Sequence, residues 1–173
     1  MDEKIVAIFG TGRAKSDDSA YALAAETGRL LAEAGFVIAN GGYGGTMLAA
    51  AKGASKAGGE TIGVTCSAFK RSTANEYITR EIVTDSLDER LDTLIKLGQG
   101  YVVLAGGTGT LLELAKVWEL KNKGFLAENK PIILVGEFWK PLIDLITADD
   151  PDSTRYIHQA DSPEQAVDLI IDY

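Results

Sequence analysis

A glycine-rich turn in the second half of the chain carries the residue types expected of an anion-binding site. The run Gly106-Gly107-Thr108-Gly109-Thr110 follows an apolar segment, residues 101–104, and precedes a helical pattern that holds Glu113 one turn in. Glycines allow backbone N–H groups to turn toward a bound anion, and the positive end of the following helix faces the same place. The sequence therefore predicts a cradle for a phosphate group, with a carboxylate beside it.

Two earlier loops are also rich in glycine and also follow apolar runs. Residues 10–13 read Gly-Thr-Gly-Arg, and residues 41–47 read Gly-Gly-Tyr-Gly-Gly-Thr-Met. Each loop has a purely structural explanation, a tight turn for the first and close packing of helix on sheet for the second. Four glycines in five residues are entropically costly unless something requires the backbone to come close. The recurrence of such loops therefore favours ligand binding.

Two charged residues accompany these loops and are the predicted catalytic pair, Arg90 and Glu113. Taken alone, Glu113 is explained by stabilisation of a helix N-terminus, and Arg90 by pairing with acidic neighbours on a helix surface. Together with three glycine-rich loops they favour chemistry instead. The predicted phosphate- or nucleotide-binding residues are Gly10, Thr11, Gly12, Gly42, Gly44, Gly45, Thr46, Met47, Gly106, Gly107, Thr108, Gly109 and Thr110.

Several other kinds of site are disfavoured. Lys15 stands where a dinucleotide fingerprint needs its third glycine, and no loop continues into Gly-Lys-Ser/Thr, which argues against NAD, FAD and P-loop ATP hydrolysis. Cys66 and His158 are the single cysteine and histidine, so the chain has no intrachain disulfide and no thiolate zinc cage. We expect no metal and no cofactor. The net charge of -8 also argues against nonspecific binding of nucleic acid.

The elements that must position these residues alternate along the chain. Short apolar strands are expected near residues 4–9, 36–39, 61–65, 81–83, 101–104, 131–135 and 156–157, and helices near 19–34, 46–57, 87–97, 110–123, 139–146 and from 162 onward. Several strands are apolar on both faces. This pattern predicts an α/β fold, a Rossmann-like, doubly wound, mainly parallel sheet of about seven strands with helices on both faces. Ligands of such sheets bind at the carboxyl ends of the strands, where all three loops can meet.

The whole chain fits one domain over residues 1–173, because the length suits a single buried core and no linker or repeat divides it. Apolar residues make up 46% and charged residues 24%, as in an ordinary soluble protein. The N-terminus lacks a signal-peptide pattern, and no apolar run approaches the roughly 20 residues that cross a bilayer. We therefore expect a cytoplasmic protein.

The motifs resemble those of the LOG-like family, also described as the "possible lysine decarboxylase" family. Its hallmark, Pro-Gly-Gly-x-Gly-Thr-x-x-Glu, matches residues 105–113 at every position but the proline, which alanine replaces. Arg90 falls at the separation of the family's catalytic arginine, and residues 41–47 resemble its earlier glycine-rich loop. The chain departs from the family pattern at Leu91, where a lysine is usual, and at Leu112, where a second glutamate is frequent.

The resemblance implies a nucleoside 5'-monophosphate phosphoribohydrolase, which releases a free base and ribose 5-phosphate. The amides of residues 107–110, helped by residues 44–46, would hold the phosphate. Glu113 would stabilise positive charge on the ribose and position water, while Arg90 would orient Glu113 or bind ribose and phosphate. The alternative is a non-catalytic carrier of a nucleotide or of the molybdenum cofactor, because carriers of this fold are related to the enzymes.

A lysine decarboxylase is the least consistent of the activities associated with this family, because no motif supplies a Schiff-base lysine for pyridoxal phosphate. The expected partner is a small phosphorylated ligand, with no nucleic acid and no membrane. The resemblance also implies a homodimer or a larger homo-oligomer. The apolar stretch 111–120, which includes Trp118, is a candidate for a helix face that a second subunit covers. Arg71 and Arg80 are further cations whose place relative to the ligand depends on the tertiary structure.

Overall fold

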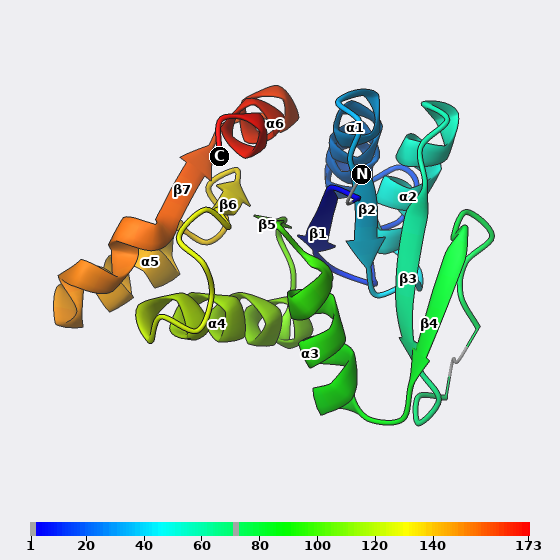
Figure 1. Cartoon of the computed structure of the whole chain (residues 1–173). Helices are drawn as coiled ribbons and strands as arrows, with labels where there is room; N and C mark the ends of the chain where they lie inside the picture. The colour runs from blue at the N-terminus through cyan, green and yellow to red at the C-terminus, as the bar shows by residue number, and fades with distance from the viewer. Residues whose placement is uncertain (1–2, 71–72) are drawn as a thin grey trace.

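The computed structural model describes residues 3–70 and 73–173 and builds them around one seven-stranded sheet (Figure 1). The strands are β1 (Ile5–Phe9), β2 (Val37–Asn40), β3 (Thr61–Cys66), β4 (Arg80–Thr84), β5 (Gly100–Val103), β6 (Ile132–Val135) and β7 (Ile157–Ala160). They lie in the order β4-β3-β2-β1-β5-β6-β7, and every neighbouring pair is parallel. The predicted doubly wound α/β fold is confirmed.

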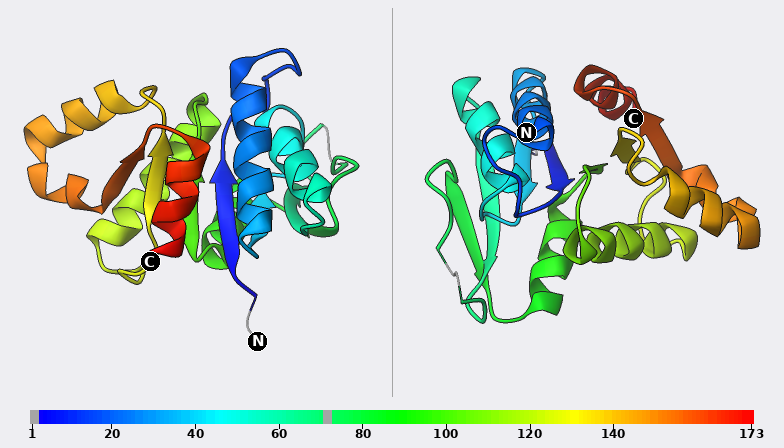
Figure 2. Two further views of the ribbon diagram at one scale, coloured as in Figure 1. Left: turned by 90° about the horizontal axis from the view of Figure 1, so that it is seen from above. Right: turned by 180° about the vertical axis from the view of Figure 1, so that it is seen from behind.

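Helices cover both faces of this sheet, as the views in Figure 2 show. The helices are α1 (Ser19–Glu33), α2 (Thr46–Lys56), α3 (Leu87–Leu97), α4 (Thr108–Asn122), α5 (Lys140–Asp149) and α6 (Pro163–Ile171), with a 3-10 helix, η1 (Pro151–Tyr156), before β7. One face packs on α1, α2 and α6, and the other on α3, α4 and α5. Because side chains alternate along a strand, Val6 and Ile8 of β1 enter the first layer, while Ala7 and Phe9 enter the second.

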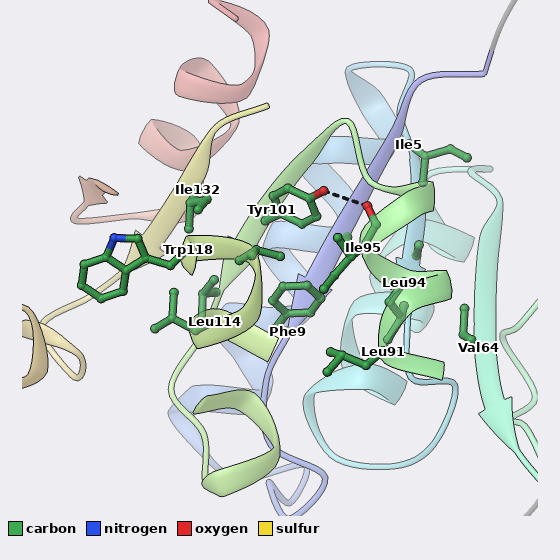
Figure 3. Packing of buried hydrophobic residues seen from close by; sticks show 14 of the residues in the cluster. Ile5, Phe9, Val64, Leu91, Leu94, Ile95, Tyr101, Leu114, Trp118 and Ile132 are labelled. Atoms are coloured by element: carbon green, nitrogen blue, oxygen red, sulfur yellow. Dashed lines mark hydrogen bonds between the residues drawn. The ribbon is translucent and has the colours of Figure 1, made fainter. Parts of the chain in front are cut away.

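The layer beneath α3 and α4 holds the larger aromatic residues of the core (Figure 3). Phe9 and Tyr101 stack there with ring centroids 5.9 Å apart. The Tyr101 hydroxyl donates a hydrogen bond of 2.7 Å to the carbonyl of Ile95 in α3. Burial holds the pKa of this phenol well above its ordinary value, so the phenol remains a neutral donor. This contact fixes α3 on the sheet next to β5.

On the opposite face, α1 and α2 approach each other closely because glycines lie at their crossing. A Cβ atom at Gly28 would lie 2.1 Å from the carbonyl oxygen of Ala50, and one at Gly53 would lie 1.9 Å from that of Ala25. A real side chain at either position would therefore force the two helices apart. The small residues of α2 serve this packing, while the N-terminal end of α2 reaches the carboxyl edge of the sheet.

Most expected boundaries agree with the structure within one to three residues. The helix expected over residues 87–97 spans that range, and α4 begins at Thr108, two residues before the expected start. The expected cap of the last helix is present, since the Ser162 hydroxyl accepts a hydrogen bond from the Gln165 amide. The 3-10 helix was not predicted from the sequence. None of the helices that the structure describes is long and apolar enough to cross a membrane.

Candidate functional site

The three glycine-rich loops meet at one edge of the sheet because the strand order reverses at β1. This strand pairs with β2 on one side and with β5 on the other, and the loops follow β1, β2 and β5. Their closeness is visible at Gly10, where a Cβ atom would lie 2.4 Å from Oγ1 of Thr46 and 3.4 Å from Cβ of Leu104. The expected meeting of the loops at the carboxyl edge is therefore a feature of the fold.

Backbone and hydroxyl hydrogen bonds tie the first loop to the second. The amide and the hydroxyl of Thr46 both donate to the carbonyl of Thr11, at 2.9 and 3.0 Å. Gly45 has a φ of +63°, and a Cβ atom there would lie 2.3 Å from the same carbonyl oxygen. The buried Asn40 side chain donates to the carbonyl of Met47 and accepts from the amide of Gly42. Gly45 and Thr46 thus hold the loops in place.

A cavity of about 730 Å³ opens where the loops meet. Its lining comprises Gly10, Thr11, Gly12, Arg13, Tyr43, Met47, Phe69, Arg90, Gly107, Thr108, Gly109, Thr110 and Glu113. A recess of about 390 Å³ adjoins it along Gly12, Tyr43, Met47 and Phe69, and adds Gly44, Thr73 and Asn75. Both predicted catalytic residues therefore face one cavity together with most of the predicted binding residues.

Four predicted binding residues are absent from the described lining of both hollows: Gly42, Gly45, Thr46 and Gly106. Gly106 lies against the helix that follows, since a Cβ atom there would be 2.1 Å from Oγ1 of Thr110. This close approach, like that of Gly45, shows why these positions lack a side chain. Gly45 and Gly106 thus shape the loops, and residues next to them form the surface of the cavity.

The first turn of α4 forms one wall of the cavity. Gly107 is the N-cap residue, and residues 107–109 are exposed at the mouth of the cavity. The first N–H groups of a helix have no partner within it, and a helix of 15 residues carries a substantial dipole. Negatively charged groups are stabilised at such an end. The predicted anion cradle would therefore lie at the exposed start of α4, where it opens on the cavity.

Glu113 lies one turn into α4, on the side of the helix that faces the cavity. Burial raises the pKa of this carboxyl to about 7, although the positive charge of Arg90 opposes part of the rise. Arg90 acts on Glu113 through its charge alone, because no hydrogen bond links these two side chains, both of which the structure describes. Near neutral pH, Glu113 can thus exchange a proton with a group in the cavity.

Arg90 comes from the first turns of α3 and is 9% exposed. Its Nε donates a hydrogen bond of 2.8 Å to the carbonyl of Val64, and its Nη2 one of 3.2 Å to the carbonyl of Gly41. A guanidinium has five N–H donors, so these two bonds leave donors for a ligand in the cavity. A Cβ atom at Gly41 would lie 1.8 Å from Nη2, so a side chain there would displace the guanidinium from this position.

Three residues of the cavity wall were absent from the predicted site. Arg13 is the last residue of the first loop, and its positive charge was a usable signal. Tyr43 lies inside the second glycine-rich loop, and an aromatic residue among glycines was also a signal. Phe69 belongs to residues 66–79, which show no periodicity, so only the tertiary structure brings it to the cavity.

The departures from the LOG-like pattern fall outside the cavity. Leu91 is 4% exposed and packs in the core beneath α3, as Figure 3 shows, so its side chain does not leave a gap in the described lining. Leu112 is 41% exposed on the outer side of α4. Trp118 does not lie on a surplus apolar face, as the sequence suggested, because it is buried and donates to the carbonyl of Ser153.

Of the two further arginines, Arg80 lies away from the cavity. Arg80 begins β4, at the amino edge of the sheet, where it pairs with Glu3 and Glu60. This edge lies opposite the glycine-rich loops. Arg71 falls outside the residues that the structure describes.

Fold and site together define a Rossmann-like α/β protein with a polar cavity at the switch point of a parallel sheet. Comparison with known proteins gives the family: residues 3–167 match the SLOG cluster4 family, and the chain belongs to it. The resemblance to LOG-like proteins is thereby confirmed. The chain is also 36% identical over 116 residues to a cytokinin riboside 5'-monophosphate phosphoribohydrolase of Mycobacterium tuberculosis. That match covers 65% of this chain and 60% of the relative, so the chain spans less than two thirds of the enzyme's length.

Solved structures add similarity over nearly the whole chain. A molybdenum cofactor binding protein from Rippkaea orientalis superposes with a TM-score of 0.82 at 28% identity, covering 99% of this chain and 98% of that one. A molybdenum cofactor carrier protein from Chlamydomonas reinhardtii gives 0.81 at 26% identity, with the same coverage. The relatives thus include both enzymes and carriers, which matches the two functions that the sequence left open.

Proposed function

We propose that this protein is a nucleoside 5'-monophosphate phosphoribohydrolase, which hydrolyses the N-glycosidic bond to a free base and ribose 5-phosphate. The observation that carries the proposal is that Glu113 and Arg90 both line one cavity, at the N-terminal end of α4. A carrier has less need of a carboxylate next to a phosphate cradle. The similarity to the mycobacterial phosphoribohydrolase supports the same reaction.

In this proposal the chemistry follows from where charge develops. The amides of residues 107–110 bind the 5'-phosphate, which fixes the ribose within reach of Glu113. Cleavage of the glycosidic bond builds positive charge on the ribose, and the Glu113 carboxylate stabilises it and orients the attacking water. Arg90 binds the phosphate or the ribose hydroxyls as a planar fork of donors. Thr46 uses its amide and hydroxyl on Thr11, so the second loop contributes shape to the cradle.

A second candidate is a non-catalytic carrier of a nucleotide or of the molybdenum cofactor. Whole-chain similarity to two such proteins favours it. The replacement of lysine by Leu91 is weaker support than the sequence suggested, because the Leu91 side chain lies in the core. Retention of both Arg90 and Glu113 favours the enzyme.

An assay of products separates the two functions. Purified protein is incubated with AMP, GMP, CMP, UMP and an N6-substituted AMP, and free base is measured by chromatography. We expect release by the wild type and none by Glu113→Gln, with nucleotide binding by the variant retained in calorimetry. Binding without release by the wild type would assign the protein to the carriers.

We also propose a homo-oligomer, with a dimer as its smallest form. Leu111 and Leu112 are 36% and 41% exposed on α4 next to Glu113, and a second subunit could cover them. Light scattering of the eluting protein measures the mass directly. A monomer at micromolar concentration contradicts this proposal.

A further inference from the structure

Arg90 lies in an unusual environment for a buried cation. Its guanidinium carbon is 5.5 Å from the ring centroid of Tyr43 and 5.6 Å from that of Phe69. The two ring centroids are themselves 6.0 Å apart, with the planes tilted by 40°. The three groups thus form a nearly equilateral triangle, in which the cation contacts both rings and the rings contact each other. We call Tyr43 and Phe69 the aromatic pair.

Both rings are held in place by their own surroundings. The Tyr43 hydroxyl accepts a hydrogen bond of 2.8 Å from the amide of Cys66, at the end of β3. The Asn75 side chain donates to the carbonyls of Gly42 and Tyr43, at 3.0 and 2.8 Å, which fixes the backbone that carries the tyrosine. Phe69 follows β3 in a turn closed by its amide on the carbonyl of Cys66. The pair is therefore a fixed wall beside the guanidinium.

Aromatic rings stabilise a cation differently from a carboxylate. A ring face attracts the positive charge without neutralising it, whereas an ion pair with a carboxylate consumes the charge. A buried guanidinium must be compensated by hydrogen bonds together with one of these two kinds of partner. The described partners of Arg90 are two carbonyls and two rings, and Glu113, whose carboxyl feels the charge of Arg90, makes no hydrogen bond to it.

We propose that Tyr43 and Phe69 are positioning residues, which hold the Arg90 guanidinium on the carbonyls of Val64 and Gly41 and keep it out of an ion pair with Glu113. Its charge is then reserved for an anionic ligand, and the Glu113 carboxyl is left free to act on that ligand. This inference rests on the proposed function only in its last step, the use of Glu113.

Among residues 3–70 and 73–173, the charged and titratable groups that line the cavity are Arg13 from the loop after β1, Tyr43 from the loop after β2, Arg90 from α3 and Glu113 from α4. Further along α4, Lys116 pairs with Asp92 of α3 and so does not compete for Glu113. If Arg90 were released from the aromatic pair, its guanidinium could therefore form an ion pair with the Glu113 carboxylate. Since an adjacent positive charge favours the ionised carboxylate, the pKa of Glu113 would fall.

The test compares Phe69→Leu and Tyr43→Leu with two controls. Tyr43→Phe keeps the ring and removes only the hydroxyl. Tyr77→Leu removes another aromatic contact with a cation in the same segment, that of Lys52 with the Tyr77 ring, and leaves Arg90 untouched. Melting temperatures identify the variants that fold. If Tyr43→Leu fails to fold, Phe69→Leu decides the question, because Phe69 lies in a surface turn.

Three measurements test the proposal, and none of them requires the protein to turn over a substrate. They are hydrogen exchange of the Arg90 Nε–H by 15N NMR, titration of the Glu113 carboxyl by 13C NMR, and calorimetric binding of inorganic phosphate. In the two leucine variants we expect exchange to accelerate at least tenfold, the Glu113 midpoint to fall, and phosphate affinity to drop about tenfold, as expected for loss of a desolvated cation–ring contact. Tyr77→Leu should resemble the wild type, and Tyr43→Phe should lie between the wild type and the leucine variants, because it keeps the ring but loses the hydrogen bond from Cys66.

Folded leucine variants with wild-type exchange and wild-type phosphate affinity would overturn the proposal, as would a Glu113 midpoint that stays or rises. Failure of the proposed function gives a different result. In that case the wild type releases no base, while the leucine variants still differ from it in exchange, in the Glu113 midpoint and in phosphate binding.

Discussion

Glu113 is predicted to destabilise the folded protein at neutral and alkaline pH. Its pKa is about 7 in the folded state and 4.5 for an ordinary glutamate. Between these values the native protein keeps a proton that the unfolded chain has lost, so wild-type stability falls as pH rises and levels off above pH 7. Glutamine does not titrate, so its contribution to stability does not change with pH. The free energy of unfolding of Glu113→Gln, relative to that of the wild type, should therefore increase between pH 4.5 and about pH 7.

The size of the effect follows from the same two values. The span from 4.5 to about 7 corresponds to about 3.5 kcal/mol, at about 1.4 kcal/mol for each pH unit. Because Glu113 is only partly covered and its cavity is open to water, we expect about half of this, or about 1.8 kcal/mol. Under the proposed function the stabilised variant should at the same time lose turnover, which is the trade-off expected of a catalytic carboxylate held in an unfavourable place.

Denaturation with guanidinium chloride at about pH 5 and about pH 8, at one protein concentration, measures the difference in the free energy of unfolding between Glu113→Gln and the wild type. Fluorescence of the buried Trp118 and Trp139 reports the transition. Glu119→Gln is the matched control, since this residue lies on the outer side of the same helix and is exposed. If the stability gain of Glu113→Gln were equal at both pH values, the assignment of a raised pKa to this carboxyl would be wrong.

Four further outcomes are expected. Turnover should rise with pH through a midpoint near 7, because Glu113 must be ionised to stabilise positive charge; a fall over that range would make it an acid instead. Arg90→Lys should weaken binding of inorganic phosphate about tenfold in calorimetry, since lysine cannot form the same fork of bonds. Gly41→Ala should also weaken binding of inorganic phosphate about tenfold, because its Cβ would lie 1.8 Å from Nη2 of Arg90 and would displace that side chain. Gly53→Ala should lower the melting temperature by about 5 °C, through a clash worth about 2 kcal/mol with Ala25.

Controls for the glycine variants exist in the same chain. A Cβ atom at Gly109 would meet nothing within 4 Å, so Gly109→Ala tests the helix substitution without the clash. It should leave the melting temperature unchanged or raise it slightly. Wild-type phosphate binding by Gly41→Ala would show that Arg90 does not depend on that glycine. A wild-type melting temperature for Gly53→Ala would mean that α1 and α2 can separate at little cost.

Much of the fold could be predicted because its signals are local. Strands apolar on both faces and helices between them are typical of a covered parallel sheet, and that prediction was confirmed. The glycines before α4 also revealed a helix start at the carboxyl end of a strand. Local signals failed where tertiary contacts decide, as at Trp118, which is buried against η1 although its sequence position suggested a free face.

The sequence by itself determined the loops, the Arg90–Glu113 pair and their place at one edge of the sheet, because the order of strands and glycines restricts where the chain can turn. Only the tertiary structure decided what surrounds the pair. It placed Leu91 in the core and Phe69 beside Arg90, two facts that depend on which side of α3 faces the sheet and on how residues 66–70 fold back. It also separated Arg90 from Glu113, since the carbonyls of Val64 and Gly41 hold the guanidinium. Such distances arise between segments far apart in the chain, so no local pattern encodes them.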